Sequence, residues 1–147
     1  MTRALRRSGT TAAALAATAV LLAGCSGQSE YCAAVEENAA TLESLGKERT
    51  TAAYTSYAEA FESVAAVAPA DVEDDWTAMA EVTRGVLEAQ ESVGHGLEEM
   101  TDDEVLAALS QEQLASLNEA YEAFNGTADQ RTAVVKNVKQ ECDITLQ

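Results

Sequence analysis

Apolar residues recur at intervals of three and four along most of the chain after residue 29, which is the spacing of one face of an α-helix. The spacing predicts a first helix over residues 30–45, with Gly46 as the residue that ends it. A second helix is predicted over residues 50–68. It ends before Pro69, because the residue that precedes a proline disfavours helical dihedral angles.

The same periodicity predicts a third helix over residues 71–93, which ends at the sequence Gly94-His95-Gly96. Two capping boxes follow it. Thr-Asp-Asp-Glu at 101–104 predicts the start of a short helix, and Ser-Gln-Glu-Gln at 110–113 predicts the start of a long one.

The last part of the chain gives two conflicting signals. Asn125-Gly126 is typical of a helix end, and Thr-Ala-Asp-Gln at 127–130 forms a third capping box. The apolar spacing nevertheless continues without a change of phase, and a glycine inside a helix costs only about 1 kcal/mol. Two helices with a tight break are therefore expected, with a single kinked helix as the alternative. The residues that keep the phase are Ala128, Val135, Val138 and Cys142.

These elements predict an all-α fold, an antiparallel bundle of four to five helices. The single proline in 147 residues favours helix over sheet, and an apolar content of 47% argues against disorder. The expected core is Val35, Leu42, Phe61, Val64, Trp76, Met79, Val86, Leu109, Leu117, Tyr121, Phe124, Val135 and Val138.

Charge narrows the choice of partners. The chain has 25 acidic and nine basic residues, with a net charge of −16 at pH 7. All the acidic residues and six of the basic ones follow position 25, so that part alone carries −19. Such a chain repels nucleic acid and anionic lipid headgroups, and it can attract a basic partner or a cation. No nucleic-acid partner is predicted.

The N-terminal part has the features of an export signal. A basic segment at 1–9 precedes an uncharged Ala- and Leu-rich stretch at 10–23, which is shorter than the roughly 20 residues that span a bilayer. Leu22-Ala23-Gly24-Cys25 follows and resembles the lipobox of bacterial lipoproteins. The high alanine content and the acidity resemble those of actinobacterial proteins.

This resemblance implies a domain organisation. Residues 1–24 would be a signal peptide, cut between Gly24 and Cys25, and the Cys25 sulfur would carry a diacylglyceryl group with palmitate-type chains. Two acyl chains anchor a protein stably. Residues 25–29 would be a short tether, and 30–147 an acidic domain at the outer face of the cell membrane. An uncleaved N-terminal anchor is the alternative.

The resemblance also bears on the cysteines. With Cys25 lipidated, Cys32 and Cys142 remain, and a pair outside the cytoplasm is expected to oxidise. The predicted disulfide would join the start of the first helix to the end of the last. Two free, buried thiols are the alternative. A metal site is less expected, because the sequence has no CxxC motif.

Candidate chemistry is sparse. His95 is the only histidine, which excludes a histidine-based triad, a multi-histidine zinc site and a bis-histidine haem. Its flanking glycines predict an exposed loop histidine; the alternative is a single haem or metal ligand, with Glu98 or Met100 nearby. The acidic clusters at 71–75 and 98–104 are interpreted as residues at helix starts, where the helix dipole favours negative charge. Weak binding of a divalent cation is the alternative.

The sequence predicts a non-enzyme, since it contains no nucleophile–base pair and no phosphate-binding loop. The expected function is a binding or interaction module of the cell envelope that recognises a protein, an envelope polymer or a small ligand. The alternative is a carrier that holds an apolar molecule or haem between helices. No cofactor is assigned. A carrier requires a sizeable apolar cavity beside the aromatic residues, which otherwise only fill the core: Tyr54, Tyr57, Phe61, Trp76, Tyr121 and Phe124.

Overall fold

A computed structural model describes residues 29–146, and every regular element in this range is helical. Five helices have 14 residues or more, in agreement with the expected all-α bundle. The signal peptide, the lipobox and Cys25 lie outside the described residues. The elements are α1 (Glu30–Glu43), α2 (Thr51–Ala65), α3 (Glu73–Val93), the 3-10 helix η1 (Leu97–Thr101), α4 (Asp103–Ala108), α5 (Gln111–Asn125) and α6 (Ala128–Cys142).

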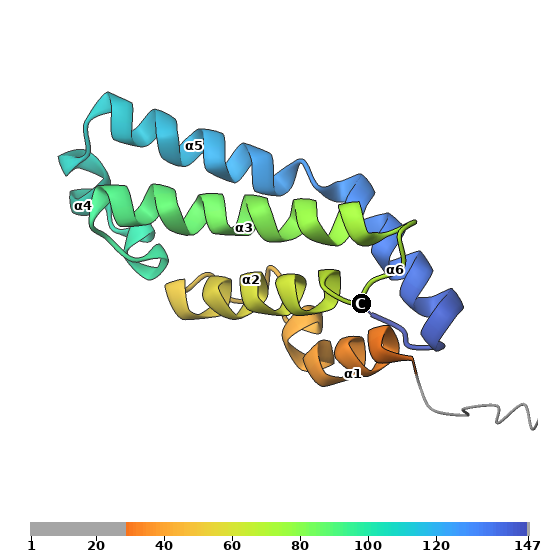
Figure 1. Cartoon of the computed structure of the whole chain (residues 1–147). Coiled ribbons are helices and arrows are strands. Elements are labelled where there is room, and N and C mark those ends of the chain that lie inside the picture. Colours follow the sequence, from red (N-terminus) through yellow and green to blue (C-terminus); the bar gives the residue numbers. More distant parts are fainter. Residues whose placement is uncertain (1–28, 147) are drawn as a thin grey trace, which may run out of the picture.

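Helix α3 is the central element of the bundle. It packs between α2 on one side and α5 on the other, each antiparallel to it (Figure 1). Helices α1 and α6 contact each other at the end where α3 begins, while η1 and α4 connect α3 to α5 at the opposite end. The arrangement confirms the antiparallel bundle that the helical periodicity predicts.

Local capping explains most of the helix boundaries. The Ser29 hydroxyl accepts a hydrogen bond from the backbone N–H of Cys32, and Thr50 caps α2 in the same way. The predicted capping box at 110–113 is present, with both reciprocal hydrogen bonds formed. Gly94 has a φ angle of +76° and ends the third helix where expected. Helix α1 instead ends at Glu43 with Ser44 as its cap, before the predicted end at residue 45, and Gly46, with a φ angle of +77°, lies in the turn that follows.

The other two predicted capping boxes are wrong. Thr101 is the last residue of η1, and Asp102 caps α4 instead through its carboxylate. The Thr127 hydroxyl donates to the carbonyl oxygen of Phe124 rather than capping α6. The break itself is confirmed, because α5 ends at Asn125 and α6 begins at Ala128.

Ten of the thirteen predicted core residues are buried, and three are not. Leu109 and Tyr121 are half-buried, and Val135 is 37% exposed while its neighbour Val134 is 2% exposed. On α6 the buried face passes through Val134 and Val138, which are four positions apart, and Val135 lies about 100° around the helix from Val134.

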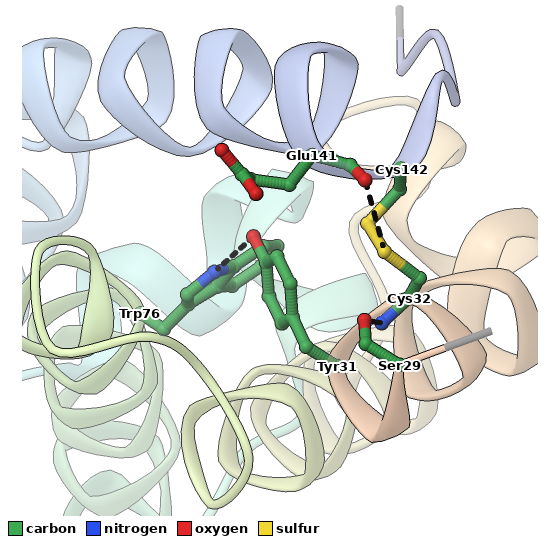
Figure 2. Close-up of a disulfide and its surroundings, with 6 residues drawn as sticks. All are labelled: Ser29, Tyr31, Cys32, Trp76, Glu141 and Cys142. Atoms are coloured by element: carbon green, nitrogen blue, oxygen red, sulfur yellow. Dashed lines mark hydrogen bonds between the residues drawn. A yellow bond between two sulfur atoms is a disulfide. The ribbon is translucent and has the colours of Figure 1, made fainter. Parts of the chain in front are cut away.

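The disulfide between Cys32 and Cys142 is present and joins α1 to α6 across 110 positions (Figure 2). The Cys32 sulfur also lies 3.6 Å from the carbonyl oxygen of Glu141; this is a contact only, because a disulfide sulfur carries no proton. Beside it, the indole N–H of Trp76 donates to the Tyr31 hydroxyl oxygen at 3.2 Å. This hydrogen bond satisfies the one polar atom of a fully buried indole.

No helix within residues 29–146 combines the length and the apolar character needed to cross a membrane.

Candidate functional site

A hollow of about 540 Å³ lies between the turn after α1 and the middle of α6. We call it the apolar groove. Aliphatic and aromatic side chains from five helices and the C-terminal segment form most of its wall. The lining residues are Leu42, Leu45, Gly46, Phe61, Trp76, Met79, Phe124, Arg131, Thr132, Val134, Val135, Lys136 and Leu146.

The base of the apolar groove is aromatic. Phe61 and Trp76 are 1% and 0% exposed, and their ring centroids lie 6.1 Å apart. Because the indole N–H is bonded to Tyr31, Trp76 has no polar atom left for a ligand. Helical spacing places these residues: Trp76 and Met79 are three positions apart on α3, so both face α2 and α6. The two rings therefore lie beneath the groove with almost no exposed surface, and the apolar surface open to a ligand comes from less buried lining residues such as Leu45 and Val135.

The rim of the apolar groove is basic. Arg131 and Lys136 line it, and none of its described lining residues is Asp or Glu. A guanidinium nitrogen of Arg131 donates to the backbone carbonyl of Asn125 at 3.2 Å, which directs the side chain toward the end of α5. The chain has 25 acidic residues, so a hollow whose only charged lining residues are basic differs in charge from the rest of the surface.

A second hollow of about 500 Å³ adjoins the groove and shares Gly46, Phe124 and Arg131 with it. We call it the polar hollow. Polar side chains from the α1–α2 loop, η1 and α5 form about half of its wall. The remaining lining residues are Arg49, Tyr54, Leu97, Glu98, Met100, Thr101, Asn118, Tyr121 and Asn125.

Burial changes the acidity of the tyrosines in the polar hollow. Loss of hydration raises the pKa of Tyr121 to about 12 and also raises the pKa of Tyr54, while the nearby charge of Arg49 opposes both shifts. Both hydroxyls are neutral at physiological pH, as is a tyrosine with the ordinary pKa of 10.0, and the raised pKa values move their ionisation further into the alkaline range. They are hydrogen-bond donors and not additional negative charges.

The Tyr121 shift predicts an alkaline loss of stability. Its folded pKa of about 12 exceeds the ordinary value of 10.0, so folding favours the neutral form. This contribution is complete below pH 10 and is lost as the pH rises through 12. In Tyr121→Phe we expect the tyrosinate absorbance step near pH 12 to disappear and the stability loss between pH 10 and 12 to become shallower. An unchanged absorbance titration would contradict the assignment.

The structure brings most of the predicted aromatic residues to the two hollows. Phe61 and Trp76 line the groove, Tyr54 and Tyr121 line the polar hollow, and Phe124 lines both. Tyr57 lines neither one. Its hydroxyl instead donates to the carbonyl of Ser44 at 2.6 Å, which ties α2 to the end of α1.

The residues considered as haem or metal ligands do not converge. His95 lies in the turn after α3 and is half-buried, with Nδ1 3.6 Å from a carboxylate oxygen of Glu99. It lines neither hollow, whereas Glu98 and Met100 line the polar one. The Glu98 carboxylate accepts hydrogen bonds from the N–H and hydroxyl of Thr51, which lower its pKa.

The acidic cluster at 71–75 lies at the start of α3, and three of its members occupy the first helical turn. Within residues 29–146, no three side chains of His, Cys, Asp or Glu are placed to hold a metal ion. Sequence reasoning missed the cations of the hollows, Arg49, Arg131 and Lys136. The feature of the sequence that could have indicated them is the small number of basic residues, since only six follow position 25.

No protein-family model, curated protein or solved structure matches the chain. The chain is therefore classified by its own fold and site, as an all-α bundle closed by a disulfide, with an apolar groove that has a basic rim.

Proposed function

We propose that this chain is an extracytoplasmic binding lipoprotein, held at the outer face of the cell membrane by acyl chains on Cys25, and that the apolar groove is its ligand site. The observation that carries the proposal is the groove itself, an apolar hollow whose base is formed by Phe61 and Trp76. Its volume falls in the range of small-molecule sites.

The groove favours a small ligand over a protein or polymer partner. Water in an apolar hollow finds few hydrogen-bond partners, so a ligand that displaces it gains about 25 cal/mol for each Å² of apolar surface buried. Protein docking would instead call for a broad exposed apolar patch. The large hydrophobic side chains exposed within residues 29–146 are Val67 and Val135, and Val135 already belongs to the groove wall.

Haem is a less suitable ligand than a purely organic apolar molecule. The single histidine lies in the turn after α3 and lines neither hollow. The proposal therefore requires no cofactor and no catalytic step.

Trp76 provides the test, because it is the only tryptophan and lines the groove. Titration with a neutral naphthylamine probe is expected to change Trp76 emission and to transfer its excitation to the probe. Val135→Glu places a charge in the groove wall and should weaken binding about tenfold or more. Val67→Glu is the matched control, since Val67 is equally exposed at 37% but lines neither hollow.

Two outcomes would overturn the ligand site. One is a probe that leaves Trp76 emission unchanged at saturating concentration. The other is an equal loss of binding in Val135→Glu and Val67→Glu, which would indicate nonspecific adsorption. A pull-down from native envelope that recovers one protein at a surface other than the groove would favour the interaction-module alternative.

Membrane anchoring has a separate test. In Cys25→Ala we expect loss of the lipid, retention of the leader and a mass that matches the full chain. Fractionation in a bacterial host and mass spectrometry of the purified protein measure these outcomes. If wild type and Cys25→Ala have the same leader cleavage and no lipid mass, the lipoprotein assignment is wrong, while the groove proposal is unaffected.

A further inference from the structure

We propose that the ligand is a single-chain amphiphile with an anionic head group, whose tail lies in the apolar groove and whose head is held by Arg131 and Arg49. This inference rests on the proposed function and specifies the chemistry of its ligand. It requires two adjacent environments, one apolar and one cationic, and the two hollows supply them.

The distribution of cations is the first argument. Of the six basic residues after position 25, Arg84 pairs with Glu62 at 2.7 Å and Lys139 pairs with Asp143. Within residues 29–146, Lys47, Arg49, Arg131 and Lys136 have no carboxylate partner at ion-pair distance, although acidic residues are far more numerous. Three of these four cations line the two adjoining hollows, and Lys47 lines neither.

The position of Arg131 is the second argument. It lines both hollows, so its guanidinium lies where an apolar tail would meet a polar head. Its hydrogen-bond partner is a single carbonyl oxygen, and a guanidinium has five N–H donors, so most of them remain for a ligand. A planar guanidinium binds a carboxylate or phosphate in a bidentate manner.

The polar hollow completes a head-group site. Asn118 and Asn125 carry amide donors, and Tyr121 carries a hydroxyl donor. Glu98 is the one acidic residue among the described residues that line either hollow. Its carboxylate is engaged by Thr51 at the start of α2, which leaves Arg49 and Arg131 available for an anion.

The net charge of the whole chain increases the selectivity for amphiphiles over anions that have no apolar tail. A net charge of −16 repels small anions at long range, and that repulsion is screened by salt. A free carboxylate without a tail is therefore expected to bind poorly, because Arg49 and Arg131 alone must overcome the repulsion from the negative net charge of the chain. An amphiphile adds the apolar contribution of the groove, so tail and head are both required.

The test compares amphiphiles of equal tail length below their micelle concentration, with Trp76 emission as the readout. The head groups are carboxylate, alcohol and trimethylammonium. We expect the carboxylate to bind about tenfold or more tightly than the alcohol, and the trimethylammonium compound to bind most weakly. Arg131→Gln and Arg49→Gln should each remove most of the carboxylate preference and leave alcohol binding unchanged. Arg131→Lys should retain part of it.

Arg84→Gln is the matched control, because Arg84 is also a guanidinium but lies outside both hollows in a pair with Glu62. Circular dichroism checks that each variant folds. Equal affinity for carboxylate and alcohol in wild type would overturn the inference while leaving the ligand site intact. Failure of every amphiphile and of the neutral probe would overturn the ligand site as well. Binding only to anionic phospholipid vesicles would replace the monomeric ligand with a membrane surface and would also contradict the inference.

Discussion

Replacing Cys32 and Cys142 together by alanine is expected to lower the free energy of unfolding by about 4 kcal/mol. The bridge closes a loop of 110 positions, so its main effect is to restrict the unfolded chain, which loses more entropy the longer the loop. The native contacts around the bridge should change little, because Cys32 and Cys142 lie at the ends of α1 and α6. Urea denaturation followed by circular dichroism gives the free energy.

A reductant provides the control for the disulfide prediction. Wild type in excess dithiothreitol should unfold at nearly the same urea concentration as the double variant, and the variant itself should not respond to dithiothreitol. A wild-type midpoint that reductant leaves unchanged would show that the bridge contributes no stability. A variant that remains sensitive to reductant would point to a different thiol, with Cys25 as the only other cysteine.

Replacing Trp76 by alanine is expected to cost about 3–5 kcal/mol of stability. Trp76 is fully buried on α3, contacts Phe61 across the α2–α3 interface and donates a hydrogen bond to Tyr31 on α1. The variant therefore loses a large apolar surface, leaves a cavity and removes the partner of a buried hydroxyl. Because the only tryptophan is removed, unfolding must be followed by circular dichroism.

Two comparisons separate the contributions of Trp76. Trp76→Phe keeps most of the apolar contact but loses the N–H that Tyr31 accepts, so a smaller cost of about 1–3 kcal/mol is expected. Val67→Ala is the control at an exposed position and should stay within about 0.5 kcal/mol of wild type. A Trp76→Ala midpoint equal to that of Val67→Ala would contradict the burial of this indole.

The helices of this chain are predictable from sequence because their stability comes from one buried face, and that face appears as a three-and-four spacing. Their ends follow from local chemistry, as at Gly94 and the Ser110–Gln113 box. Prediction fails where a local motif competes with tertiary contacts. Thr127 has a capping-box sequence, yet its hydroxyl donates to the carbonyl oxygen of Phe124, and on α6 Val134 is buried instead of the predicted Val135.

The candidate site was harder to predict than the fold. The aromatic residues were identified, but the periodicity that identifies a buried ring is the same whether it faces another helix or a hollow. The cations were missed because Arg49 and Arg131 are far apart in sequence. Only the packing of the α1–α2 loop beside the α5–α6 junction brings them to one polar hollow.

The covalent bridge also determines how the domain responds to proteases. Because Cys32 and Cys142 enclose nearly the whole bundle, a single cut in an exposed segment such as α4 leaves both fragments covalently joined. Two short parts of the described chain lie outside this closed loop, residues 29–31 and residues 143–146, and the second includes Leu146, which lines the apolar groove. Loss of Leu146 would thus widen the groove without opening the closed loop, whereas a single endoproteolytic nick inside the loop would leave the two fragments joined.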